Sequence, residues 1–78
     1  MKITYDSEAD ALYISLRKAS AAYAVDIEEG VVADLDGERH VIGFEILDAG
    51  KRLNKKELSE LSIENLVSEQ TATIKLPA

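Results

Sequence analysis

The N-terminal stretch Met1-Lys-Ile-Thr-Tyr-Asp-Ser-Glu-Ala-Asp-Ala-Leu-Tyr-Ile-Ser-Leu16 decides the fold. Two short runs of alternating apolar residues, 3–5 and 12–16, flank an acidic segment, 6–10. Alternation with a period of two is typical of strands with one buried face, and the acidic segment between them is typical of a turn. The sequence therefore predicts a β-hairpin that opens a small antiparallel sheet.

The same alternation continues through residues 23–27, 31–35 and 42–46. The dipeptides Glu29-Gly30 and Asp36-Gly37 separate these runs, and Asp-Gly is a strong signal for a short hairpin. Sequential strands usually pair as neighbours. We therefore expect residues 1–47 to form an antiparallel β-meander of about five short strands, with a looser loop after the second strand.

A helical segment is predicted over residues 48–68. Asn54 and Glu57 have the spacing of a capping box, and Leu53 and Leu58 that of a hydrophobic staple. Ser62 could begin a second short helix, so one bent helix and two short helices both remain open. Residues 70–76 alternate again and predict a terminal strand. The fold class is therefore α+β in a single domain, 1–78, with the C-terminal helix packed on one face of the sheet.

The small size of the chain predicts a partner. With 78 residues, a lone hydrophobic core is marginal, and such folds usually gain support from disulfides, metals or other chains. The chain has no cysteine and one histidine, which leaves self-association or a protein partner. We expect a homodimer, in which the terminal strand could be exchanged between chains; an extended monomer tail is the alternative.

The acidic charge is uneven. The net charge is −6, and residues 1–50 carry 4 Lys or Arg against 11 Asp or Glu, which gives −7. An acidic sheet repels phosphate, so direct nucleic-acid binding is disfavoured, whereas a small basic protein or a cation is attracted. Ordinary solubility charge is the alternative interpretation. No signal peptide or membrane span is visible, and the lack of cysteine fits a reducing cytoplasm, so a soluble cytoplasmic protein is expected.

Asp6, Glu8 and Asp10 are the candidate metal ligands. Alternate carboxylates can surround a hard cation, but the segment lacks the central glycine and distal glutamate of an EF-hand loop. The same residue types are common in turns, where they bond backbone N–H groups. A structural turn is the favoured interpretation, and a cation-dependent enzyme or metal-binding protein is the alternative.

Tyr13, Val32 and Val41 are the candidate partner-binding residues. Their parity points them to the nominally polar face of the sheet, where together they would form an apolar contact patch. Alternatively, both faces of the sheet are covered and Tyr13 is buried for that reason. His40 fits a turn or strand end, and the basic residues Lys51, Arg52, Lys55 and Lys56 fit solvated charge or pairing with the acidic sheet.

The first 53 residues resemble a bacterial domain-of-unknown-function family, number twenty-two eighty-three. The resemblance rests on Tyr5-Asp6, Asp10, Leu12-Tyr13-Ile14, residues 30–34, residues 41–48 and the basic pair Lys51-Arg52. It implies a fold but no established activity, catalytic residue or cofactor. Similar small proteins often stand beside a second small protein, in what resembles a toxin–antitoxin arrangement.

These observations favour a non-enzymatic interaction protein with no catalytic residue and no cofactor. We expect it to act as a homo-oligomer or as the acidic, antitoxin-like partner of a small basic protein. Contact with a membrane or directly with nucleic acid is not expected.

Overall fold

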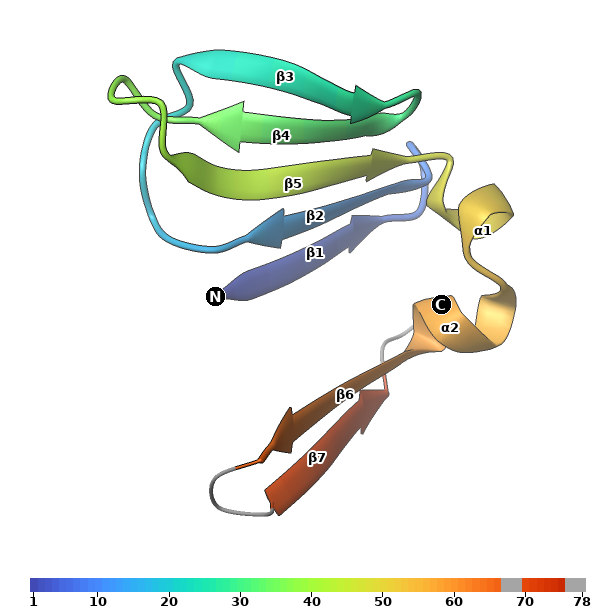
Figure 1. Cartoon of the computed structure of the whole chain (residues 1–78). Coiled ribbons are helices and arrows are strands. Elements are labelled where there is room, and N and C mark those ends of the chain that lie inside the picture. Colours follow the sequence, from blue (N-terminus) through green and yellow to red (C-terminus); the bar gives the residue numbers. More distant parts are fainter. Residues whose placement is uncertain (67–69, 76–78) are drawn as a thin grey trace.

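The computed structural model describes residues 1–66 and 70–75. It consists of a five-stranded antiparallel sheet, two short helices and a separate two-stranded hairpin (Figure 1). The strands of the sheet are β1 (Lys2–Asp6), β2 (Ala11–Ser15), β3 (Tyr23–Glu28), β4 (Val31–Leu35) and β5 (Val41–Leu47). The elements that follow are α1 (Ala49–Arg52), α2 (Lys55–Ser59), β6 (Glu60–Asn65) and β7 (Gln70–Lys75). The predicted sheet of five short antiparallel strands is confirmed.

The strand order in this sheet is β1-β2-β5-β4-β3. Consecutive strands pair as expected for a meander in β1–β2 and in β3–β4–β5, but β2 lies next to β5 instead of β3. This pairing sets Leu12 opposite Ile46 and gives the apolar strand β5 a central position. Strand β3, which carries Asp26 and Glu28, takes an edge, where charged side chains discourage pairing with other chains.

Two connections within the sheet explain its local geometry. Gly30 has a φ of 84° in the β3–β4 turn, a conformation that glycine adopts without a steric cost. Between β4 and β5 the chain uses residues 36–40 instead of the two-residue Asp-Gly turn that the sequence predicted. One carboxylate oxygen of Asp36 accepts the backbone N–H groups of Glu38 and His40, each at 2.9 Å, and this stabilises the wider loop.

The predicted start of the helix at Asn54 is confirmed. The Asn54 side chain accepts the Glu57 N–H at 2.8 Å, and the Glu57 carboxylate accepts the Asn54 N–H at 3.1 Å, which completes a capping box. Leu58 is buried, and Leu53 packs against the same cluster. The described residues form two helices, each about one turn long.

The prediction of a helical segment over residues 48–68 is wrong beyond Ser59. Residues 60–65 form β6, in which Leu61 and Ile63 lie on one side and pair with β7. The period of two in this segment outweighs the helical spacing of Leu58 and Leu61, because a partner strand is available nearby in the chain. The predicted terminal strand is present as β7. Residues 67 and 68 of the predicted helix, and residue 76 of the predicted strand, lie outside the described residues.

The prediction that the terminal strand is exchanged between chains is not supported. Strand β7 pairs with β6 of its own chain over six residue pairs, from Glu60 with Lys75 to Asn65 with Gln70. The hydroxyls of Ser62 and Thr73 are 3.1 Å apart on one side of this hairpin.

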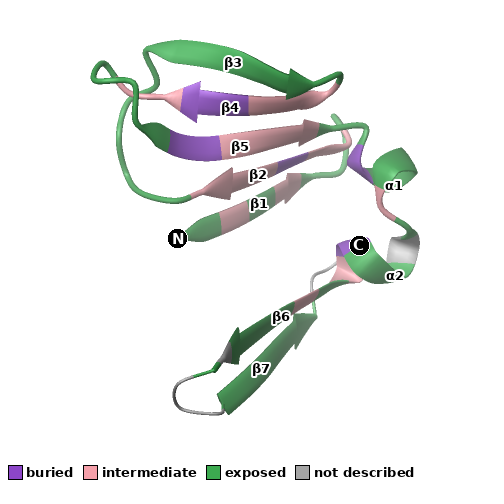
Figure 2. Cartoon of the chain, in the orientation of Figure 1, coloured by how far each residue is buried: buried purple, intermediate pink, exposed green. Residues whose placement is uncertain are grey.

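Ala33 and Ile42 are buried on β4 and β5, and a small hydrophobic cluster lies at the end of the sheet next to the helices (Figure 2). Leu12, Ala49 and Leu58 form its buried centre, and partly buried Ile3, Tyr5, Ile46 and Leu53 pack around it. The predicted packing of a C-terminal helix across one sheet face is therefore wrong, because α1 and α2 contact only this end. Neither the helices nor the hairpin forms a full second layer over the sheet (Figure 1).

Candidate functional site

The polar face of the sheet carries a cluster of acidic and aromatic side chains. The strand register places Tyr13 of β2 and Val32 of β4 on either side of Glu45 of β5. Asp34, two residues along β4 from Val32, shares this face and lies opposite Gly43. We call Tyr13, Val32, Asp34 and Glu45 the acidic face.

Gly43 makes room for the tyrosine. A Cβ atom at Gly43 would collide with the Tyr13 hydroxyl and would come within 2.9 Å of the Ile14 carbonyl oxygen. The Tyr13 ring therefore lies across the glycine. Burial and a hydrogen bond to Asp34 raise the pKa of the Tyr13 phenol above its ordinary value, as does the charge of Asp34 and Glu45.

The two carboxylates are close enough to influence each other. Asp34 is buried, with 9% of its surface exposed, and Glu45 is half-buried. Burial raises the pKa of the Glu45 carboxyl, and the neighbouring Asp34 adds to this through its charge and a hydrogen bond. Among the described residues no lysine or arginine forms an ion pair with either carboxylate.

The predicted partner-binding residues are only partly brought together. Tyr13 and Val32 both adjoin Glu45, and both are half-buried. Val41 pairs with Leu35 beyond a bulge at the far end of the sheet, and it is 40% exposed. Sequence reasoning missed that Asp34 and Glu45 occupy the centre of this face. The alternation of the strands was the available signal, because it places both carboxylates on the same side as Tyr13.

The Asp6, Glu8 and Asp10 segment forms a turn that is held by its own carboxylates. One oxygen of Asp6 accepts the backbone N–H of Glu8 at 3.0 Å and of Ala9 at 3.3 Å. Asp10, in a left-handed conformation with a φ of 50°, accepts the Tyr5 hydroxyl at 2.8 Å and the Gly50 N–H at 2.9 Å. These contacts tie the first hairpin to α1, as expected of structural turn residues.

The same contacts bear on the metal hypothesis. The hydrogen bond to Asp10 is the main cause of a raised pKa of the Tyr5 phenol, which binds Asp10 as a proton donor. Within residues 1–66 and 70–75, no group of three His, Asp or Glu side chains is placed to hold a metal ion.

His40 and the basic segment have local structural roles. His40 is exposed at the end of the β4–β5 loop, with Nδ1 3.8 Å from an Asp36 carboxylate oxygen. The backbone N–H of His40 is the main influence that lowers the pKa of Asp36, and a contact with Arg17 adds to it.

Arg52 donates from Nε to the Leu47 carbonyl oxygen at 2.9 Å and also contacts the Glu29 carbonyl oxygen. Arg52 thus binds backbone, and it forms no ion pair with an acidic side chain of the described residues.

The described residues define a small antiparallel-sheet domain, joined through two short helices to a two-stranded hairpin. Residues 2–49 match the family described as "Protein of unknown function (DUF2283)", and the chain belongs to this family. The match confirms the resemblance seen in the sequence, and it ends where α1 begins. No curated protein and no solved structure matches the chain. No helix in the described part of the chain is long and apolar enough to cross a membrane.

Proposed function

We propose that the chain is a non-enzymatic interaction protein whose acidic face binds a small basic protein. The observation that carries this proposal is the pair of carboxylates, Asp34 and Glu45, held beside Tyr13 on the side of the sheet opposite the hydrophobic cluster. Ionising Glu45 is costly because its carboxyl is partly removed from water and lies beside Asp34, which raises the pKa of Glu45. A lysine or arginine of a partner would remove that cost.

The chemistry of this face suits a basic, partly apolar binding surface. Tyr13 offers an aromatic ring over which a guanidinium can stack, and Val32 offers apolar contact. The net charge of −6 would steer a basic partner toward the sheet and raise the association rate at low salt. This is the role of the acidic member of an antitoxin-like pair, and the cysteine-free composition suits such a pair in the cytoplasm.

The test uses an amphipathic peptide of lysine, arginine and leucine, with a glutamate-substituted peptide of the same length as its control. We expect the basic peptide alone to shift the amide resonances of Tyr13, Val32 and Glu45, and we expect high salt to weaken binding. Glu45→Lys should abolish the shifts. Glu38→Lys makes the same charge change on an exposed loop residue and should retain most of the binding.

The partner itself is then sought by capture from a native lysate with the wild type and with Glu45→Lys as matched baits. A small basic protein that binds only the wild type at low salt would support the proposal. Binding that withstands high salt and is unchanged in both Tyr13→Ala and Glu45→Lys would rule out this face as the binding surface.

A further inference from the structure

On the side of the sheet opposite the acidic face, one row of side chains is apolar from edge to edge. The strand register lines up Ile3, Ile14, Phe44, Ala33 and Val25 in one row across β1, β2, β5, β4 and β3. None of these side chains is charged. The row is open toward β3, where Val25 is 44% exposed and Ile27, at the bulge between Asp26 and Glu28, is 60% exposed.

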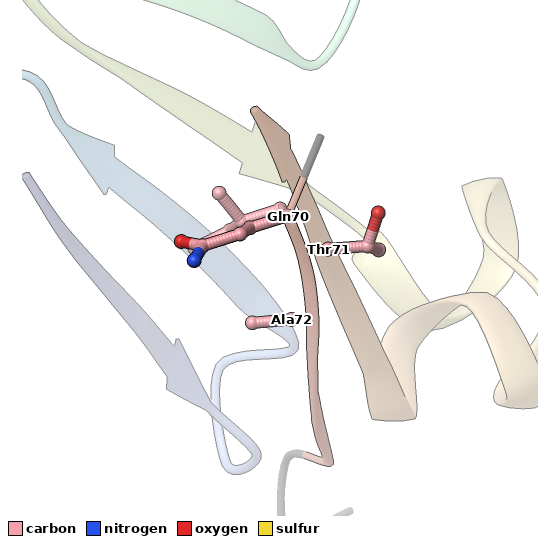
Figure 3. Close-up of a pocket in the computed structure, with 4 residues that line it drawn as sticks. Gln70, Thr71 and Ala72 are labelled. Atoms are coloured by element: carbon pink, nitrogen blue, oxygen red, sulfur yellow. The ribbon is translucent and has the colours of Figure 1, made fainter. Parts of the chain in front are cut away.

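The β6–β7 hairpin continues this apolar side. Leu61 pairs with Ile74 and Ile63 with Ala72, so these four residues share one side of the hairpin. Figure 3 shows Ala72 pointing to one side of β7 and Thr71 to the other. Ile63 is 53% exposed and Ile74 is 47% exposed. We call the apolar row of the sheet, Ile27 and these four hairpin residues the apolar surface.

An open groove joins the two parts of the apolar surface. It has a volume of about 320 Å³ and is lined by Met1, Ile3, Leu61, Ile63 and Ile74. A second hollow of about 420 Å³ lies on the hairpin itself, at Ile63, Gln70, Thr71 and Ala72 (Figure 3). Side chains from β1 and from the hairpin therefore face a shared space that residues 1–66 and 70–75 do not fill.

The area of the molecule shows how much cover is missing. The accessible surface is 6039 Å², about 1,300 Å² more than the roughly 4,700 Å² expected of a compact monomer of 8.5 kDa. The radius of gyration is 13.8 Å, against about 11.5 Å for a compact domain of this length. A stable interface buries about 800 Å² on each partner, so the excess is large enough to form one.

We infer that the apolar surface binds the apolar surface of a second copy of the chain, side chain against side chain, around a two-fold axis. A two-stranded hairpin is at best marginally stable alone in water, so a partner that covers its apolar side must be present whenever the chain is folded. A second copy of the chain is present wherever the chain itself is. Two chains of net charge −6 repel each other, and the apolar surface is where they can approach without opposing like charges.

This interface goes beyond the proposed function because it uses the other side of the sheet. It leaves the acidic face of each copy open to solvent in the dimer. It also differs from strand exchange, because β6 and β7 remain paired within their own chain.

The test measures the mass of the full chain by sedimentation at micromolar concentrations. We expect a dimer of about twice 8.5 kDa. Val25→Asp and Ile63→Asp should each raise the dimer dissociation constant at least about 100-fold, because each would bury an unpaired charge. Ser62→Asp places the same charge on the other side of β6, and it should leave the constant within about threefold.

A monomeric wild type would overturn the inference, including the case in which a different protein covers the surface. A dimer that is unchanged in both Val25→Asp and Ile63→Asp would place the interface elsewhere and would also overturn it. If a variant fails to fold, isotope-filtered NMR on a mixture of labelled and unlabelled wild type replaces it. We expect intermolecular contacts between methyl groups of Val25, Ile27, Ile63 and Ile74. A dimer without these contacts would contradict the inference. Glu45→Lys should leave the dimer intact, so failure of the proposed function is distinguishable.

Discussion

The five-stranded sheet and the β6–β7 hairpin are built from the same alternating pattern but differ in what supports them. Strands β2, β4 and β5 each have a neighbour on both sides and include buried Leu12, Ala33 and Ile42. Each hairpin strand has one neighbour, and the only buried or half-buried residue described in the pair is Leu61. Alternation therefore suffices to form strands, whereas stability depends on how many sides of each strand are covered.

The largest contrast is expected between core and hairpin truncations. Leu12→Ala should lower the free energy of unfolding by about 2–5 kcal/mol, because it removes the centre of the small core. Leu66→Ala, at a residue that is 80% exposed, should change it by less than about 0.5 kcal/mol. Urea denaturation of the variants at one protein concentration measures both, and similar losses would show that the core is not where the buried cluster places it.

A second contrast compares two glycines. Gly43→Ala should cost about 1–3 kcal/mol, because its methyl group would overlap the Tyr13 hydroxyl and press on the Ile14 carbonyl. Gly37→Ala is the matched control, since a Cβ there has no neighbour within 4 Å. Thermal unfolding of the pair measures the difference. Equal melting temperatures would mean that Tyr13 does not lie over Gly43.

The helical connection between sheet and hairpin gives a smaller effect. Asn54→Ala should lower the free energy of unfolding by about 1 kcal/mol, because the Glu57 N–H loses its acceptor. Asn54→Asp keeps an acceptor oxygen and should restore most of the loss. Chemical denaturation distinguishes the two, and no loss in the alanine variant would remove the capping box as a source of stability.

The smallest effect is electrostatic and has a defined sign. The pKa of Glu45 is raised above its ordinary value of 4.5, so the folded state holds this proton more tightly than the unfolded chain does. The stability from this proton is complete below pH 4.5 and is lost as pH rises through the folded pKa. Glu45→Gln should therefore raise the free energy of unfolding at neutral pH by a few tenths to about 1 kcal/mol. It should also reduce the fall in stability between acid and neutral pH.

Asp36 gives the opposite sign. Its pKa is lowered from 3.8, so its contribution is present above that pH and is lost as pH falls through the folded pKa. Asp36→Asn should therefore lower the melting temperature at neutral pH and have little effect in strong acid. Thermal melts of both variants across pH measure these effects. A destabilised Glu45→Gln at neutral pH would contradict the arrangement of the acidic face.

Much of the sheet could be predicted because its signals are local. Alternation located the five strands, and the spacing of Asn54 and Glu57 located a helix start. The position of β5 beside β2 could not be read in the same way, because it depends on apolar pairs such as Leu12 with Ile46 that are distant in sequence. The segment after Ser59 fits both the helical spacing and the strand alternation of apolar residues, and its pairing with β7 decides for the strand.

The candidate site shows the same division. The parity of Tyr13 and Val32 correctly placed them on one face, but Val41 was separated from them by a bulge that no local signal announced. The carboxylate of Asp10 was recognisable as a turn group, whereas its bond to Gly50 joins residues 40 positions apart. Sequence reasoning thus found the residue types of the site but not their long-range partners.

Hydrogen–deuterium exchange of the wild type, compared between low and high protein concentration, tests most directly the claim that the hairpin depends on a second copy for its cover. We expect the amides of β2, β4 and β5 to be protected more strongly than those of β6 and β7 at both concentrations. We also expect protection of β6 and β7 to rise with concentration, as the dimer forms. Protection of the hairpin that is strong at low concentration and does not change would contradict this, because the single chain would then suffice.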